Sequence, residues 1–183
     1  KTPNGELMLT VPVFTKGLLQ QKICNVIIDS SQKYQKKHFN TICTNYKKSK
    51  FYNVIVTELE EVYNMEFSKL SDLNITIIKW LSAKLGIKTK FLQSSQLDVQ
   101  GNKTELLVDI CKKTNADYYL SPAGSKKYIE KNNLFKKSGI NLRYQDYKHP
   151  NYCQLFGDFI PCLSVIDLIL NEGDDSLKIL NKN

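Results

Sequence analysis

Residues 117–128, with the sequence DYYLSPAGSKKY, decide the fold class of this 183-residue chain. The first four residues are typical of a short strand, and Pro and Gly then mark a turn into a helix expected over residues 125–131. A second strand is expected after this helix, over residues 140–146. A buried strand over residues 88–93 and a helix over 103–114 are expected before residue 117. This alternation is typical of βαβ units, so we predict an α/β fold with a mostly parallel, Rossmann-like sheet.

The N-terminal half has a different pattern. Two short strands are expected over residues 5–14 and 23–29, and helical spacing of apolar side chains then begins. The first expected helix carries Phe39, Ile42, Cys43 and Tyr46, the second carries Ile55, Leu59 and Val62, and the third carries Asn74, Ile77, Ile78, Leu81 and Leu85. The third helix opens near Ser71 and stops at Gly86, a suitable residue for a helix end.

The C-terminal part is expected to be helical. Residues 163–170 are apolar nearly all round, which predicts a buried helix, and Gly173 can end it. Ser164 and Asp167 stand three positions apart, as in a capping box. We therefore predict a single α/β domain over residues 1–183. Its expected parts are a helical insertion at about 31–86, a βαβαβ portion at about 87–148 and C-terminal helices over 162–182.

The composition limits the class of protein. Hydrophobic residues make up 42% of the chain and charged residues 24%, which excludes a disordered protein. The longest apolar stretch, around residues 160–170, is too short to span a membrane, for which about 20 residues are needed. The five cysteines form no C-x-x-C pair, so we expect a reduced, cytoplasmic protein.

The net charge of +8 comes almost wholly from lysine, because Arg143 is the single arginine among 26 basic residues. Lysine is a hydrated point charge and reads base edges poorly. We therefore predict no nucleic-acid partner, and a coding bias explains the excess of lysine better than such a function does.

Candidate ligand-binding residues follow two of the expected strands. Ser121 and Gly124 lead into a helix that also carries Tyr128, and ligands of open α/β sheets bind at this edge. Ser94 and Ser95 follow the strand expected over 88–93, so the two loops are expected to converge on one crevice. The alternative for residues 121–128 is a plain turn with a helix cap.

The loop over residues 143–154 is dense in polar and aromatic groups. His149 can act as a general acid or base, and Gln145, Tyr152 and Gln154 can bind a sugar or nucleotide by hydrogen bonding and stacking. The alternative is a surface loop with packed tyrosines.

His38 lies among lysines, and we interpret this region as a solvated helix face rather than an anion site. No metal site and no cofactor are predicted, since His149, Cys153 and Cys162 match no zinc spacing.

Several stretches together resemble the WbqC-like family of bacterial proteins. The most specific runs from Tyr144-Gln145-Asp146 through His149-Pro150, Tyr152, Gln154 and Phe159-Ile160-Pro161 to Asn171-Glu172-Gly173. Further matches are Lys1-Thr2-Pro3-Asn4-Gly5, Gln21-Lys22-Ile23, Leu70-Ser71-Asp72-Leu73-Asn74, Lys103-Thr104-Glu105-Leu106-Leu107 and Ala116-Asp117-Tyr118-Tyr119-Leu120-Ser121. They keep the family's order over most of the chain. Family members typically begin with a further strand and a His-Gln-Pro stretch, so the resemblance predicts a truncated chain.

The resemblance implies a cytoplasmic role in bacterial surface-polysaccharide (O-antigen or capsule) biosynthesis. We expect an enzyme that transfers a group, an amino-acid-like acyl group being one candidate, to a nucleotide-linked amino sugar. The expected site combines Ser121, Gly124, Tyr128, Gln145, His149, Tyr152 and Gln154, with His149 as the proton-transfer group. The alternative is a scaffold protein that binds partner enzymes of the same pathway. The sequence specifies no oligomeric state.

Overall fold

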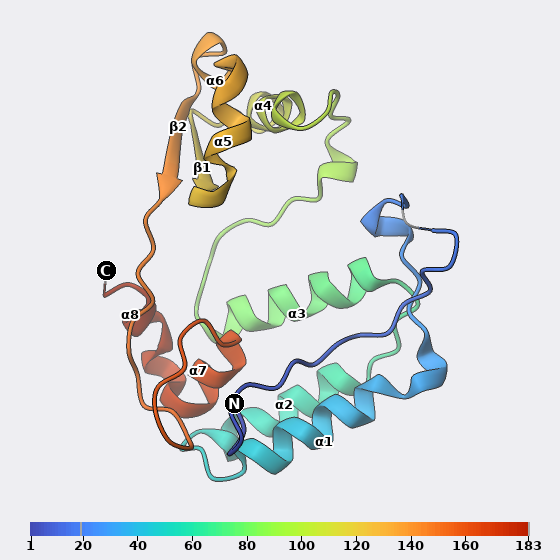
Figure 1. Ribbon diagram of the computed structural model, residues 1–183, viewed down its shortest axis with the longest axis vertical. Helices are drawn as coiled ribbons and strands as arrows, with labels where there is room; N and C mark the ends of the chain where they lie inside the picture. The colour runs from blue at the N-terminus through green and yellow to red at the C-terminus, as the bar shows by residue number, and fades with distance from the viewer. Residues whose placement is uncertain (19, 183) are drawn as a thin grey trace. The chain divides into compact units, whose positions relative to one another are not determined.

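The computed structural model describes residues 1–18 and 20–182, except for the side chain of Lys131. The chain forms two compact units (Figure 1). Unit one comprises residues 1–88 and 149–183, and unit two comprises residues 89–148. Helices and strands are mixed, as predicted. The expected Rossmann-like sheet is not seen in the described residues, whose named strands form one two-stranded sheet.

Three helices follow one another in unit one: α1 (Tyr34–Tyr46), α2 (Tyr52–Asn64) and α3 (Leu70–Lys84). They run in alternating directions (Figure 1). On α2, the predicted residues Ile55, Leu59 and Val62 are all buried, because spacings of four and three place them on one helical face. On α3 the predicted stripe is partly wrong: Leu73 is the buried residue and Ile78 is exposed.

The C-terminal helices α7 (Val165–Glu172) and α8 (Ser176–Leu180) complete unit one. Gly173 follows α7 with a φ of +53°, which confirms the expected helix end. The main core of unit one joins α7 to the first two helices through six buried residues: Ile42, Tyr46, Ile55, Leu59, Ile169 and Leu170.

The two strands expected over residues 5–14 and 23–29 shrink to isolated bridges. Val13 pairs with Ile28, and Ile27 pairs with Lys69, both in antiparallel fashion. Residues 23–25 form a 3₁₀ turn instead of a strand. The segment before Val13 runs extended along the helices (Figure 1) and contributes Leu9 to the packing of the core.

Unit two contains α4 (Thr104–Lys113), β1 (Tyr118–Pro122), α5 (Lys126–Ile129), α6 (Leu134–Lys137) and β2 (Asn141–Gln145). The two strands are parallel and in register from Tyr118 opposite Asn141 to Pro122 opposite Gln145. The predicted βαβ unit over this region is therefore confirmed. Helices pack on one face of the sheet through five buried residues: Val108, Cys111, Ile129, Phe135 and Ile140.

The strand expected over residues 88–93 is wrong, because this segment has no regular structure and its Phe91 and Leu92 are exposed. An apolar run forms a strand only where another strand accepts its hydrogen bonds. Within the described ranges, the helices are all too short or too polar to cross a bilayer.

Candidate active site

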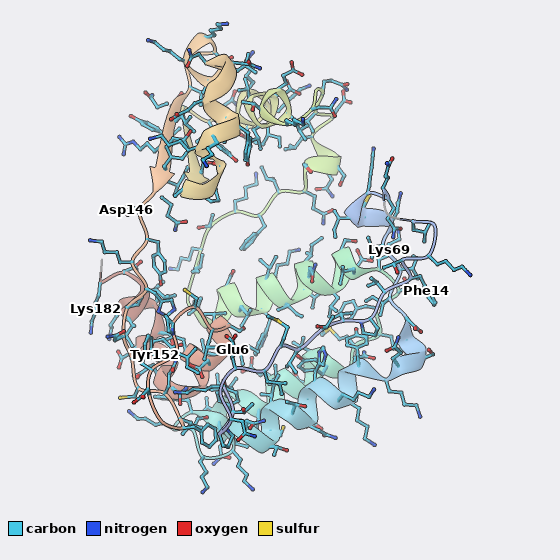
Figure 2. All side chains as sticks on the ribbon, in the orientation of Figure 1. Glu6, Phe14, Lys69, Asp146, Tyr152 and Lys182 are labelled. Atoms are coloured by element: carbon cyan, nitrogen blue, oxygen red, sulfur yellow. The ribbon has the colours of Figure 1, made fainter. Side chains whose placement is uncertain are left out.

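Unit one contains a cavity of about 500 Å³ beside α1, which we call the α1 cavity. Its walls come from the three long helices, the start of α7 and the extended segment that carries Glu6; Figure 2 labels Glu6 and Tyr152 in unit one. Aliphatic side chains dominate the walls. His38, Tyr46 and Asp167 are polar groups among them. A mostly apolar cavity with few polar groups is the usual form of a small-molecule site.

One face of α1 builds a wall of this cavity. Tyr34, His38, Ile42 and Tyr46 recur every four residues and are all buried, and the last three line the cavity. The expected solvated position of His38 is therefore wrong, because its side chain is only 8% exposed. Lys36 and Lys37 beside it are exposed.

The ring of His38 is held in one orientation. Its Nε2 lies 3.1 Å from the carbonyl oxygen of Thr10. The rings of Tyr34 and Tyr63 meet it edge-on, with centroids 5.5 and 6.2 Å away. A carbonyl oxygen can only accept, so Nε2 carries the hydrogen and Nδ1 keeps its lone pair in the neutral ring. Burial lowers the pKa of His38, which favours this neutral form.

Asp167 anchors a second polar group at the cavity. It is 1% exposed, and each carboxylate oxygen accepts one tyrosine hydroxyl: Tyr46 donates to Oδ1 at 2.8 Å and Tyr152 donates to Oδ2 at 2.8 Å. The expected capping box is therefore corrected. Ser164 caps α7 alone, accepting from the N–H of Ile166, while the carboxylate of Asp167 turns into the protein. Burial and this carboxylate raise the pKa of Tyr46.

Three residues of the predicted site, His149, Tyr152 and Gln154, lie together near the carboxylate of Asp167. The amide of Gln154 accepts from Ile160 N and donates to Ile160 O and to the Tyr152 hydroxyl, at 2.9, 2.9 and 3.2 Å. The ring of His149 packs near Tyr152 and Phe159, with centroids 6.1 and 5.8 Å away. Gln154 therefore shapes its own loop. His149 stands behind Tyr152 and does not line the α1 cavity.

The other predicted residues belong to unit two. Ser121 is 1% exposed, and its hydroxyl oxygen lies 2.6 Å from that of Ser125, which itself donates to Pro122 O at 2.7 Å. Gly124 has open space around it, and Tyr128 and Gln145 are exposed. The two serine hydroxyls thus fix the turn between β1 and α5.

Ser94 and Ser95 lie in an exposed 3₁₀ turn over residues 94–96. The expected convergence of this turn and Ser121 on one crevice loses its basis, because the described residues 88–93 form no strand.

Sequence reasoning missed His38 and Asp167. Both carried a signal: an aspartate stands inside an otherwise apolar run, and a histidine lies four residues from Tyr34 and from Ile42.

The model of the WbqC-like protein family matches residues 1–179. The chain belongs to this family. A relative, "Uncharacterized protein Rv1507c" of Mycobacterium tuberculosis, is 31% identical over 178 residues, which cover 96% of this chain and 76% of the relative. No solved structure matches the chain.

The α1 cavity gives this WbqC-like chain a defined chemical capacity. A neutral imidazole is a proton acceptor, and aliphatic walls exclude water from a bound apolar group. Asp167 has both carboxylate oxygens occupied by tyrosine hydroxyls, so it orders the cavity wall.

Proposed function

We propose that the WbqC-like chain is a cytoplasmic enzyme of bacterial surface-polysaccharide biosynthesis. It transfers an acyl group to the amine of a nucleotide-activated amino sugar. The resemblance to the family supports the pathway and the substrate class. The α1 cavity supports the enzymatic form of the proposal.

The observation that carries the proposal is a buried histidine in the wall of an apolar cavity. Aliphatic side chains of Leu59, Ile77 and Leu81 suit the hydrocarbon part of an acyl group, and His38 supplies a titratable group beside it. Titratable groups whose pKa is shifted by burial cluster at active sites. A protein that only binds partner proteins has no need of this arrangement.

The sequence-based assignment of proton transfer to His149, on the loop with Tyr152 and Gln154, stays a prediction. Substitution of His149 by Gln is part of the test, because this loop carries the most specific match to the family. The ligand roles of Ser94, Ser95, Ser121, Gly124, Tyr128 and Gln145 likewise stay predictions.

A scaffold is the second candidate, and one feature of unit two favours it. Tyr118 and Leu120 are 57% and 63% exposed on β1, and the guanidinium of Arg143 lies 4.8 Å from the centre of the Tyr118 ring. Parallel sheets are usually covered on both faces, so this face suits a partner protein.

The test is a binding and transfer experiment on the full chain. Nucleotide-linked amino sugars and short aliphatic acyl thioesters are screened by thermal shift. A ligand at 100 times its Kd stabilises the folded state by about 2.7 kcal/mol. Pairs that bind are then incubated, and the acylated sugar is sought by mass spectrometry. An enzyme gives a product that grows with time and with protein concentration. Failure of every pair to bind supports the scaffold instead.

A further inference from the structure

We propose that His38 is the general base of this transfer: its Nδ1 accepts the proton that the attacking amine loses in the α1 cavity. The inference rests on the proposed function and adds a catalytic residue to it. It also differs from the sequence-based assignment, which placed proton transfer on His149.

The contact with Thr10 fixes the tautomer of His38. The Thr10 carbonyl, 3.1 Å from Nε2, requires the hydrogen on that nitrogen. The neutral ring then presents its lone pair at Nδ1. In other base-catalysed sites the imidazole is oriented in this way by an acceptor on its far nitrogen. Here the orienting acceptor belongs to the extended segment that also forms a wall of the cavity.

The position of His38 also suits a base. His38 lines the α1 cavity and also a smaller cavity of about 190 Å³, which Tyr34 and Lys37 line as well. Among the described residues, the buried hydroxyl of Tyr34 has no hydrogen-bond partner. His38 therefore stands between two cavities in a wall whose polar groups are not all satisfied from within the protein.

The charge state of His38 depends on its neighbours. On α1 the titratable groups near it are Tyr34, Lys37 and Tyr46. Titratable groups from other elements also line the α1 cavity: Lys1, Glu6, Tyr63, Cys162 and Asp167. Tyr34 and Tyr63, which meet the ring directly, are neutral below pH 10 because burial raises the pKa of both. Burial lowers the pKa of His38, so the base is unprotonated at neutral pH.

The step balances with an acyl thioester as donor. The amine nitrogen of the sugar attacks the carbonyl carbon, so that a C–N bond forms and the C–S bond breaks. The nitrogen loses one proton to Nδ1 of His38. His38 then returns this proton to the departing thiolate, and no oxidant or reductant is required.

The decisive variant is His38→Gln in the full chain. The Gln amide can still donate to the Thr10 carbonyl, but it cannot accept a proton as a base. We expect kcat to fall by about 10²–10⁴-fold while thermal shifts with the nucleotide-linked sugar and the thioester persist. His149→Gln is the competing variant, because it replaces the other of the two histidines in the chain. Loss of turnover in His149→Gln but not in His38→Gln would place proton transfer on His149 and overturn the role of His38.

A second measurement does not depend on the variant's folding. NMR of the wild-type chain follows the two histidine Cε1–H signals with pH, and His149→Gln assigns them. The acid limb of the pH profile of kcat/KM must follow the titration of His38.

If this acid limb follows the titration of His149, or if His38→Gln turns over at the wild-type rate, His38 is not the base, although the proposed function stands. If the wild-type chain acylates no sugar with any thioester, both the proposed function and the base are overturned.

Discussion

The hydroxyl of Tyr46 donates a hydrogen bond of 2.8 Å to Oδ1 of Asp167, joining residues that are 121 positions apart. The same hydroxyl accepts from the main-chain nitrogen of Lys1 at 2.5 Å. Tyr152 occupies the other oxygen of Asp167. One buried carboxylate therefore ties together α1, α7, the start of the chain and the loop that carries His149. A buried carboxylate is tolerated only when such partners replace water.

The first prediction concerns this carboxylate. Tyr46→Phe leaves one carboxylate oxygen and the Lys1 nitrogen without their partner, and we expect the free energy of unfolding to fall by about 1–3 kcal/mol. Tyr152→Phe acts on the same carboxylate, so the double variant should depart from additivity by about 0.5–3 kcal/mol. Urea unfolding of the four proteins measures both quantities.

Tyr34→Phe is the matched control for that experiment. It also removes a buried tyrosine hydroxyl, but this hydroxyl has no partner among the described residues. We expect no loss of stability, because removing an unsatisfied polar atom is neutral or favourable. Equal losses for Tyr34→Phe and Tyr46→Phe would mean that the hydrogen bond to Asp167 contributes nothing specific.

The helices of the fold could be predicted and most of the strands could not. Helical hydrogen bonds are local, so the spacing of Ile55, Leu59 and Val62 already specifies α2. Strands need a partner that is distant in sequence. Residues 118–122 and 141–145 provide one for each other, whereas residues 88–93, with a similar apolar pattern, have none. Apolar pattern alone does not separate these two cases.

The site was harder to predict for a related reason. Ser164 and Asp167 have the spacing of a capping box, and the same spacing also allows Asp167 to point inward. Tyrosines at positions 46 and 152 decide between the two, and their contacts depend on the tertiary fold. The predicted apolar stripe of α1 contains Ile42 and Tyr46, which are buried, but it omits Tyr34 and His38, which lie eight and four residues before Ile42 on the same face.

The second prediction is a loss of stability in acid. Burial lowers the pKa of His38 in the folded chain, while the unfolded chain keeps a value near 6.5. Below about pH 6.5 the unfolded state therefore binds a proton that the folded state does not, and stability falls as the pH falls. The slope from this group is at most about 1.4 kcal/mol per pH unit. Urea unfolding at pH 5–8 should show a slope that is smaller in His38→Gln than in the wild-type chain.

The third prediction is a loss of stability in alkali. Burial raises the pKa of Tyr63 to about 12 in the folded chain, above the value near 10 of the unfolded chain. The unfolded state therefore loses this proton first, and the stabilising contribution fades as the pH rises from about 10 to about 12. Tyr63→Phe should flatten the stability profile in that window. A profile that Tyr63→Phe leaves unchanged would show that its hydroxyl is accessible to water.

The fourth prediction tests the contact between Phe51 and the end of α7. Phe51 N donates to Leu170 O at 3.0 Å, and its ring lies where a Cβ at position 173 would stand. Gly173→Ala therefore adds overlap to the strain of a positive φ. Gly86→Ala is the control, because Gly86 also has a positive φ but open space around it. We expect Gly173→Ala to lose about 1–3 kcal/mol more stability than Gly86→Ala. Equal losses would show that the Phe51 ring moves aside without cost.

The last prediction separates packing from ligand binding at Ser121. Ser125 donates to Pro122 O, so Ser121 must be the donor in the 2.6 Å pair with Ser125. Ser121→Ala removes this buried hydrogen bond, and we expect a loss of about 1 kcal/mol in urea unfolding. Ser94→Ala and Ser95→Ala alter exposed side chains and should change stability by less than about 0.5 kcal/mol. Titration with a nucleotide-linked amino sugar is then run well below the melting temperature. If Ser121→Ala lowers the affinity but leaves stability unchanged, its hydroxyl contacts the ligand, and the packing explanation of the 121–125 turn is wrong.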